Sequence, residues 1–422
     1  MTIDRRDFLK TTALGSAWGL LLGGGAGAAR AAHHEGAGDA AQAGDAPAGG
    51  TESAAALEEL RAVTRELEAA FHGQWWQVAD ADDEAEARRF VLHTLQHALE
   101  VWLEGDPERP VFKRFVTPEK KLLGDNPDAW YFNALVDPAR EYRIRGNLAG
   151  ATYTSFTVEV GTGDGGMSRK IGGALNDTQF DAAPNGDFEL RVSATRPASG
   201  ERNWLRLVPG AGSISTRHYY EREVSIAADR LHHIPLVIER VDDPGPPPPP
   251  SDASVARGIR RVANFLRHNS LPPINDRPKP SFVSTVPNRF NPVVRDAGNQ
   301  EIGFAAVDNT YAQTTVRLAP DEALVVRGRF PKCRFANVVL WNRYLQTLDY
   351  AHRRCSLNRK QVRYEPDGSF EVVVAHRDPG VPNWLDMEGR REGTMFWRFQ
   401  LAEEDIAPLE AKVVKLADVA KA

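Results

Sequence analysis

The sequence predicts a mainly β protein with flanking helices, built from two tandem, duplicated β-sandwich or jelly-roll-like domains. Three observations support this fold class: an internal repeat, strand-like alternation inside each copy of it, and helical periodicity outside the copies. With 422 residues, of which 42% are hydrophobic, the chain is long enough and apolar enough to form two domain cores.

The internal repeat is the strongest of these signals. Residues 356–374 (SLNRKQVRYEPDGSFEVVV) match residues 174–192 (ALNDTQFDAAPNGDFELRV) at eight of nineteen positions, including Asn176 and Asn358. Constant spacing over further landmarks indicates two copies of one domain. The landmarks, at offsets of 180 to 183 residues, are Asp125-Asn126 with Asp308-Asn309, Pro138 with Pro320, Arg145-Gly146 with Arg327-Gly328, and NWL at 203–205 with NWL at 383–385.

Inside each copy, short runs of β-branched and aromatic residues are separated by Gly, Pro, Asn and Asp. Tyr142 and Ile144 alternate with arginines in the first copy, and residues 324–326 form an apolar run in the second. The shared motif P-(N/D)-G-x-F-E is typical of a turn that leads into a strand, because Asn-Gly and Asp-Gly readily adopt left-handed conformations. These features predict a sandwich or jelly roll in each copy.

The segments outside the copies have a different pattern. Residues 56–104 carry apolar residues at helical spacing, with one stripe of four leucines from Leu92 to Leu103, and DDPGPPPPPSD at 242–252 is typical of a stiff spacer. The chain therefore divides into a signal peptide 1–32, a flexible tether 33–55, a helical N-terminal segment 56–107, the first β-sandwich repeat 108–241, a Pro-rich linker and short helix 242–279, the second β-sandwich repeat 280–402, and a C-terminal tail 403–422.

The N-terminus has the features of an export signal. Arg5 and Arg6 precede a short apolar region, residues 13–22, and a stretch of small residues that ends at Ala32. Paired arginines, a modest apolar region and an A-x-A-like site predict a twin-arginine signal, and the apolar run is too short and glycine-rich for a membrane anchor. We therefore expect the twin-arginine export machinery as a partner, a periplasmic or secreted location, and no membrane attachment after cleavage.

Composition and motifs limit the classes of partner. The formal net charge of −5 is mild, and the sequence contains neither a P-loop nor a Rossmann glycine fingerprint, so we expect no nucleic-acid partner and leave the cofactor unknown. His93, His97 and Glu100 lie at the spacing of one helical face, as metal ligands can. However, no further Cys or carboxylate cluster completes a coordination shell, so a helix surface or core edge is favoured and no metal is predicted.

Two cysteines, Cys333 and Cys355, both fall in the second copy. In an oxidising compartment they can form a disulfide that closes a loop of about 22 residues and adds about 3 kcal/mol of stability. Two buried free thiols are the alternative, and the sequence leaves this choice open.

Three stretches of the sequence resemble a known bacterial family. They are GDNPDAWYFNALVDPAREYRIRGN at 124–147, LWNRYLQTLDYAHRRCSLN at 340–358 and YEPDGSFEVVVAHRDPGVPNWLDMEGRREGTMFWRF at 364–399. The sequence is similar to the family known as domain of unknown function 1214. This resemblance implies a β-rich sandwich and a bacterial envelope setting, and it implies no established reaction.

Candidate site residues come from the differences between the copies, since residues common to both are explained by the needs of a duplicated fold. His376 stands opposite Ala194, and Asp386 stands opposite Arg206. A histidine moves protons near neutral pH, a carboxylate orients it, and an arginine binds an acidic group, so we predict His376, Asp386 and Arg343 as catalytic residues. The predicted substrate-binding residues are Asn342, Arg353, Arg377, Arg390 and Arg391.

An alternative interpretation of the same residues is a network of ion pairs that ties strands and turns together. The function is correspondingly open between three classes. The protein is an exported hydrolase or lyase acting on a carbohydrate or acidic small molecule, a non-catalytic ligand-binding protein, or an assembly protein that forms homo-oligomers. An enzyme requires a cleft with His376 near a carboxylate, a binder requires exposed aromatic residues, and an assembly unit requires a large apolar patch.

Overall fold

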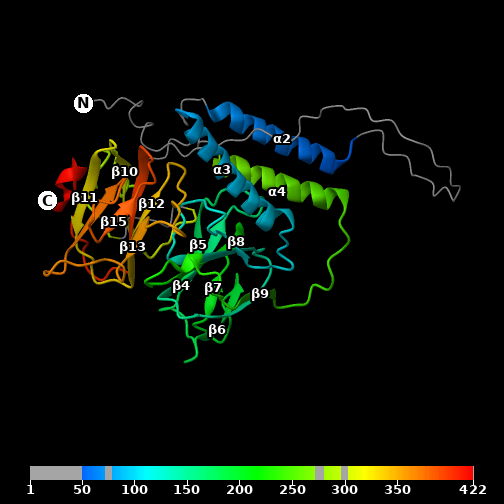
Figure 1. The fold of residues 1–422 in the computed structure, drawn as a ribbon. Helices are drawn as coiled ribbons and strands as arrows, with labels where there is room; N and C mark the ends of the chain where they lie inside the picture. The colour runs from blue at the N-terminus through cyan, green and yellow to red at the C-terminus, as the bar shows by residue number, and fades with distance from the viewer. Residues whose placement is uncertain (1–49, 72–77, 271–279, 296–302, 422) are drawn as a thin grey trace, which may run out of the picture.

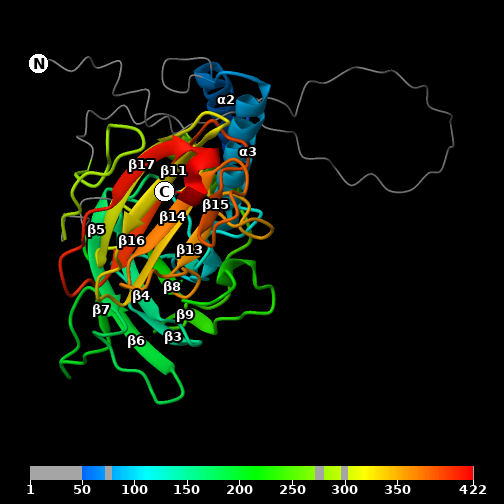
Figure 2. The same cartoon turned by 60° about the vertical axis from the view of Figure 1, so that its left-hand side comes forward.

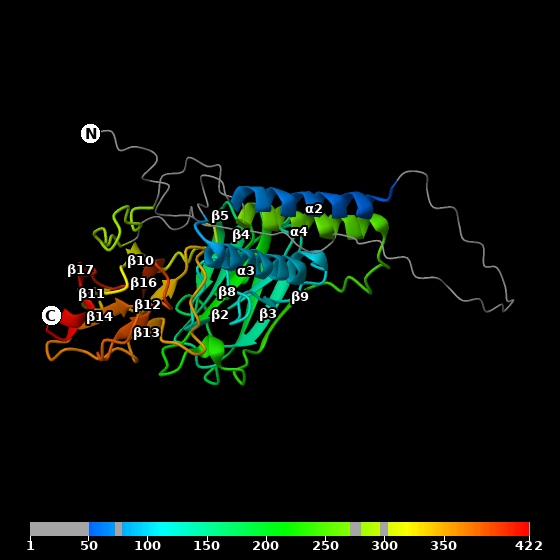
Figure 3. The same cartoon turned by 45° about the horizontal axis from the view of Figure 1, so that its top comes forward.

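α-Helices form one layer of the protein, and two β-sandwiches lie against this layer and beside each other (Figures 1 and 3). The computed structural model describes residues 50–71, 78–270, 280–295 and 303–421. Four sheets make up the two sandwiches in this part of the chain, so the predicted class, mainly β with flanking helices, is confirmed. The predicted signal peptide, residues 1–32, lies outside the described residues.

The first sandwich packs a five-stranded sheet of order β1-β2-β8-β4-β5 against a four-stranded sheet of order β7-β6-β3-β9. Ile144, Phe156 and Leu190 are among the side chains that fill the space between them. Its strands are β1 (Lys113–Arg114), β2 (Ala129–Leu135), β3 (Tyr142–Asn147), β4 (Tyr153–Val160), β5 (Lys170–Asn176), β6 (Asp187–Ser193), β7 (Trp204–Arg206), β8 (Ala211–Tyr219) and β9 (Leu236–Arg240).

The second sandwich packs the sheet β10-β16-β12-β13 against the sheet β15-β14-β11-β17. Leu324, Val338, Val372 and Trp397 lie in its core. Its strands are β10 (Asn309–Arg317), β11 (Glu322–Gly328), β12 (Phe335–Trp341), β13 (Ser356–Asn358), β14 (Phe370–Ala375), β15 (Trp384–Asp386), β16 (Glu392–Gln400) and β17 (Glu410–Lys415).

The prediction that residues 403–422 form a tail outside the second sandwich is wrong. β17 pairs with β11 over its whole length and completes the second sandwich. Ile406 and Leu409, just ahead of β17, are buried in the core of that sandwich, and Val419 after it is buried as well. The hydrophobic burial of these residues holds the last segment on the sheet.

The two sandwiches have the same order of corresponding strands. β2-β8-β4-β5 in the first matches β10-β16-β12-β13 in the second, and β7-β6-β3-β9 matches β15-β14-β11-β17. Even the parallel pairs β6–β7 and β14–β15 correspond. This identity of order supports our interpretation of the sequence repeat as a tandem duplication.

The register of the ladders corrects one detail of the repeat. Ala129 is paired with Tyr219 at the edge of the first ladder, and Asn309 is paired with Gln400 at the edge of the second. Asp308 therefore corresponds to Asp128 and not, as the sequence offset indicated, to Asp125. The sequence offset alone paired the wrong residues, because equivalence between strands is defined by their hydrogen-bonded register.

The helical layer comprises α2 (Glu52–Phe71), α3 (Ala81–Ala98), its π-helical continuation η1 (Leu99–Leu103), and α4 (Asp252–Ser270). Asp80 caps α3, its carboxylate accepting a hydrogen bond from the backbone N–H of Asp83. Leu92 and Leu99 are exposed, so the leucine stripe is not the buried face of α3. Phe90, Val91, Thr94 and His97 lie on that face instead.

α2 begins at Glu52, inside the segment that we expected as a tether up to residue 55. The first N–H groups of a helix lack partners within the helix. Here the carboxylate of Asp252, at the start of α4, accepts hydrogen bonds from the N–H groups of Glu52 and Ser53 at 2.7 and 3.1 Å. α4, which we expected inside the linker 242–279, therefore belongs to the helical layer and caps its neighbour.

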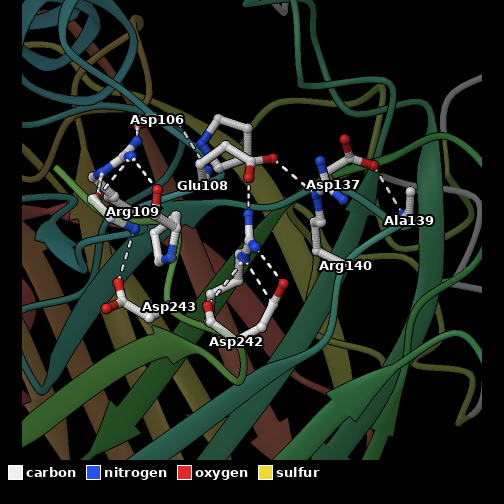
Figure 4. A network of polar contacts seen from close by, with 12 residues as sticks. Asp106, Glu108, Arg109, Asp137, Ala139, Arg140, Asp242 and Asp243 are labelled. Carbon is white, nitrogen blue, oxygen red and sulfur yellow. Dashed lines mark hydrogen bonds and ion pairs between the residues drawn. The ribbon is translucent and has the colours of Figure 1, made fainter. Parts of the chain in front are cut away.

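The Pro-rich segment before α4 lies back against the first sandwich. Arg240, at the end of β9, forms ion pairs with Glu108 and Asp242 (Figure 4). These contacts hold the segment in place, so it is not the free spacer that its composition predicts. Arg109 donates hydrogen bonds, at 2.9 to 3.1 Å, to the carbonyl oxygens of Pro244, Gly245 and Pro246.

Reciprocal hydrogen bonds join the two sandwiches, which overlap in the view of Figure 2. The side-chain amide of Asn358 donates to Asp128 at 3.0 Å, and that of Asn176 donates to Asp308 at the same distance. Each bond runs from one copy to the other, and the donors and acceptors are equivalent residues. The same patch of each sandwich is therefore used, as in a twofold-symmetric dimer interface.

Asp128 makes the stability of the contact between the two sandwiches depend on pH. Burial raises its pKa to about 6, from an ordinary value near 3.8, against the hydrogen bonds from Asn337 and Asn358 that lower it. A pKa that is higher in the folded than in the unfolded state means that protonation of Asp128 favours folding. The stability that protonated Asp128 contributes is therefore complete below pH 4 and is lost as the pH rises through 6, a change of about 3 kcal/mol.

We therefore expect Asp128→Asn, which cannot titrate, to gain about 3 kcal/mol of unfolding free energy relative to the natural protein between pH 4 and pH 7. Urea unfolding of both proteins at several pH values measures this difference and cancels the titration of other groups. Parallel pH profiles for the two proteins would contradict the assignment.

Candidate functional site

The structure does not bring the predicted catalytic residues together. His376 lies at the end of β14 with its Nε2 atom 3.3 Å from the carbonyl oxygen of Leu318, and no described carboxylate is hydrogen-bonded to its ring. Asp386 accepts hydrogen bonds from Arg353 at 2.8 Å and from the N–H of Glu388 at 2.7 Å. The carboxylate expected to orient the histidine is thus engaged elsewhere.

The predicted arginines mostly attach the second sandwich to the start of α3. Arg343 forms an ion pair with Asp83 at 2.8 Å, and Arg391 forms one with Asp80 at 2.9 Å. Their partners lie at the cap and in the acidic first turn of the helix. These contacts correspond to the ion-pair network that the sequence left open as the alternative. Arg390 likewise pairs with Glu86 and with Glu388.

The remaining predicted residues have local roles. The side-chain oxygen of Asn342 accepts hydrogen bonds from the N–H groups of Tyr344 and Gln346 at 2.9 and 3.0 Å, so it shapes the turn after β12. Arg377 is exposed. Cys333 and Cys355 are free thiols packed in or against the second core, and burial raises the pKa of Cys333 to about 11.

The loop after β12 instead forms a joint between the sandwiches and the helices. Lys121 donates hydrogen bonds to the carbonyl oxygens of Thr347 and Leu348 at 3.0 and 2.6 Å. Asp125 accepts bonds from the N–H group, at 2.9 Å, and the hydroxyl of Thr347. Full burial raises the pKa of Asp125, and the nearby Lys121 opposes the rise. This joint fixes one end of the space between the two sandwiches.

A cavity of about 310 Å³ lies in that space. Its walls come from β2 and β8 of the first sandwich, from β10 and β16 of the second, and from the segments around residues 115–125 and 303–306. Its volume is about twice that of an engineered cavity that binds benzene. The aromatic residues of the lining are Phe115, Tyr131, Phe132, Tyr219, Phe282, Phe304, Tyr311, Trp341 and Phe396.

Aromatic rings pack against one another on each wall of the cavity. Phe396 packs against Trp341 with ring centroids 4.4 Å apart and against Tyr311 at 5.0 Å. On the other wall, Tyr131 packs edge-on against Tyr219 at 6.1 Å. Such an apolar, aromatic surface binds organic groups through dispersion and the hydrophobic effect.

Two buried arginines, one from each sandwich, also line the cavity. Arg217 in β8 is paired across the ladder with Tyr131, and Arg398 in β16 is paired with Tyr311. The ladder register makes these two Tyr–Arg pairs equivalent. Arg217 and Arg398 are only 5% and 4% exposed, so the hydrogen bonds and charges around them decide how they interact with a ligand.

The hydroxyl groups of Tyr131 and Tyr311, in the cavity wall, stay protonated. Burial raises the pKa of Tyr131 well above the usual value and also raises the pKa of Tyr311. The neighbouring Tyr219 adds to both shifts. Each of these residues is therefore a neutral hydrogen-bond donor at physiological pH.

The sequence reasoning missed these cavity residues. It concentrated on polar residues that differ between the copies, whereas Arg217 and Arg398 occupy equivalent positions. An available signal was the arginine in TMFWRFQ at 394–400, because a charge inside such an apolar strand requires a specific environment. Which face of the strand it occupies, and what lies opposite, depended on the packing of two distant sheets.

The described residues contain neither a cluster of potential metal ligands nor a helix able to span a membrane. No group of three or more His, Cys, Asp or Glu side chains there is arranged to hold a metal ion. His97 is fully buried against the rings of Trp102, Phe115 and Phe265, and this burial lowers its pKa well below the usual value. None of the described helices combines the length and apolar character needed to cross a bilayer.

The contact between the second sandwich and α3 gives a testable expectation. Arg343, whose side chain is 15% exposed, should contribute more than Arg391, which is 73% exposed. Replacing Arg343 with Met should lower the free energy of unfolding by about 1–3 kcal/mol, because Asp83 then loses a partly buried partner. The matched control Arg391→Ala should cost less than about 1 kcal/mol in the same urea titration. Equal effects of the two substitutions would contradict this assignment.

Comparison with known proteins shows similarity to a solved structure and, over part of the chain, to a protein family. The crystal structure of an uncharacterized protein from Burkholderia cenocepacia is 28% identical in sequence, with a TM-score of 0.71; the match covers 87% of this chain and 98% of that one. The structure of the VPA0106 protein from Vibrio parahaemolyticus is 12% identical, with a TM-score of 0.46, and the match covers 78% of this chain and 98% of that one. The search of curated proteins produced no match.

The family match falls on the second sandwich. Residues 314–404 match the family described as "Protein of unknown function (DUF1214)". This range runs from inside β10 to just beyond β16 and includes the joint loop and Arg398. This match agrees with the resemblance of residues 340–358 and 364–399 to the same family.

Proposed function

We propose that the protein binds a small organic molecule in the cavity between its two sandwiches. The observation that carries this proposal is the cavity itself, about 310 Å³ in volume and lined by aromatic side chains from both sandwiches. Ligand sites are typically concave, mostly apolar and supplied with a few polar groups that fix the orientation of the ligand. The two Tyr–Arg pairs are such polar groups.

Binding is favoured over the hydrolase or lyase activity considered from the sequence. That activity relied on His376 acting with a carboxylate, and the carboxylate of Asp386 is bound by Arg353. Neither His376 nor Asp386 lines the cavity, and the cavity lining contains no histidine. The cavity favours recognition of a ligand over proton transfer to it.

Assembly is the less favoured role for a related reason. The faces that two separate sandwiches would use to associate are already buried against each other within this chain, through Asn176, Asn358 and their aspartate partners. The duplicated fold thus provides an internal dimer, and the space left at its centre is available to a small molecule.

The proposed setting is the periplasm, after export by the twin-arginine machinery. Arg5 and Arg6 and the apolar stretch behind them support export of a folded protein. Replacing both arginines with lysine should retain the protein in the cytoplasm. Fractionation of expressing bacteria tests this, and continued export of the variant would contradict a twin-arginine route.

Filling the cavity tests the binding proposal. We expect members of a panel of small aromatic and aliphatic compounds to raise the melting temperature of the protein by about 2 °C or more at saturating concentration. The substitution Ala305→Trp, at a residue that lines the cavity, should abolish this stabilisation because the indole occupies the ligand volume.

Ala139→Trp is the matched control, since Ala139 is exposed on a turn of the first sandwich that Figure 4 shows beside Asp137. This variant should keep the full ligand response. Stabilisation of the Ala305→Trp variant by the same compounds, or no response of the natural protein to any of them, would overturn the proposal.

A further inference from the structure

We infer that the ligand of the cavity is a monoanion, with a carboxylate on an aromatic or aliphatic body as its simplest form, bound by Arg398 and Tyr311. This inference rests on the proposed function and deepens it by assigning a chemical class. It follows from an imbalance between the two arginines, from an unused hydrogen-bond donor on Tyr311, and from the apolar character of the remaining wall.

The guanidinium group of Arg398 is buried and forms no direct ion pair with a described carboxylate. Its Nη2 atom donates to the carbonyl oxygen of Gly124 at 2.7 Å, whereas Nη1 is buried and has no partner. Among the described residues no carboxylate lies within 4.0 Å of this group, and Asp125 and Asp128 act on its charge only from beyond that distance. Its Cζ atom lies over the rings of Trp341 and Phe396, 5.1 and 4.7 Å from their centroids. A buried charge in this state is costly, and an anion in the cavity removes the cost.

Arg217, at the equivalent position, shows what a satisfied guanidinium looks like here. It donates to the hydroxyl of Thr157 at 2.8 Å and to the carbonyl oxygens of Phe304 and Ala305 at 2.8 and 3.1 Å. The fully buried carboxylate of Glu159 lies 4.0 Å away and balances its charge. Of the two arginines, only Arg398 lacks a carboxylate within ion-pair distance, which favours a ligand with a single negative charge.

Tyr311 provides a second donor next to Arg398. Its hydroxyl oxygen accepts hydrogen bonds from the N–H of Ala306 at 3.2 Å and from the side-chain amide of Asn309 at 3.1 Å. A phenol accepts two bonds and donates one, so its own hydrogen stays available. Tyr311 and Arg398 are directly opposite in the β10–β16 ladder, which brings their side chains close enough to bind one carboxylate.

The rest of the cavity selects the body of the ligand. Phe282, Phe304, Trp341 and Phe396 provide apolar surface that cannot replace the water around a sugar or an inorganic anion. A cavity of 310 Å³ has room for roughly two rings, judged against the cavity about half its size that binds benzene. This argument disfavours the carbohydrate ligands considered from the sequence.

A matched series of compounds tests the charge requirement. We expect 2-naphthoate to bind at least tenfold more tightly than 2-naphthamide or 2-naphthylmethylamine, measured by isothermal titration calorimetry on the full chain at pH 7. Equal or tighter binding of the neutral amide would overturn the anion inference and leave the proposed function standing. Failure of all three compounds to bind would count against both.

Substitutions locate the effect. Arg398→Met should remove the preference for naphthoate over naphthamide, and Tyr311→Phe should weaken naphthoate binding severalfold with little change for the amide. His376→Ala is the control outside the cavity and should bind both compounds as the natural protein does. Loss of naphthoate binding in His376→Ala, or an unchanged preference in Arg398→Met, would refute the assignment.

The ligand-free protein offers an independent readout. Because Arg398 forms no direct ion pair with a described carboxylate, Arg398→Met should leave the melting temperature unchanged or raise it. Arg217→Met should lower it, since Glu159 is then left buried without its partner. If both substitutions destabilise the protein equally, Arg398 is a structural residue and the inference fails.

Discussion

The two reciprocal Asn–Asp hydrogen bonds between the sandwiches are the constraint on which the rest of the structure depends. Asn358 holds Asp128, and Asn176 holds Asp308, so each copy grips the other through the same residues. The Asn358–Asp128 bond is buried and the Asn176–Asp308 bond is partly buried. Such amide–carboxylate bonds are costly to break, because each group left unpaired loses its hydration as well as its partner. They set the two inner sheets face to face at a fixed separation. The cavity is the part of that interface where side chains do not fill the space.

Within this nearly symmetric interface, the proposed ligand binding depends on a difference between the charges that surround Arg217 and Arg398. β8 and β16 each present an arginine to the cavity, but only the first sandwich supplies a buried glutamate beside its arginine. Satisfying Arg217 internally and leaving Arg398 to an external anion converts a structural motif into a candidate recognition site. The energetic logic is that a low-dielectric cavity makes an unpaired charge unfavourable and its neutralisation by a ligand correspondingly strong.

The polar residues that distinguish the second copy have a different importance. Arg343, Arg390 and Arg391 join the second sandwich to the acidic start of α3, and the loop between β12 and β13 joins it to the buried Lys121 and Asp125. These contacts orient the helical layer over both sandwiches and close one end of the cavity. Residues unique to one copy thus support the architecture, whereas residues at equivalent positions face the candidate ligand.

The sequence by itself determined the local and repeated features of this protein. Alternating apolar residues, Asn-Gly and Asp-Gly turns and the spacing of the repeat were enough to predict two β-sandwiches with flanking helices, because these patterns act over a few residues or recur along the chain. Only the tertiary structure decided that β17 belongs to the second sandwich, that α4 caps α2, and that Arg398 lacks the close carboxylate partner that Arg217 has. Each of these depends on partners more than 50 residues apart in the sequence, or on the face that a strand presents to a distant sheet. No local pattern encodes such contacts, since they arise from the register and packing of whole sheets.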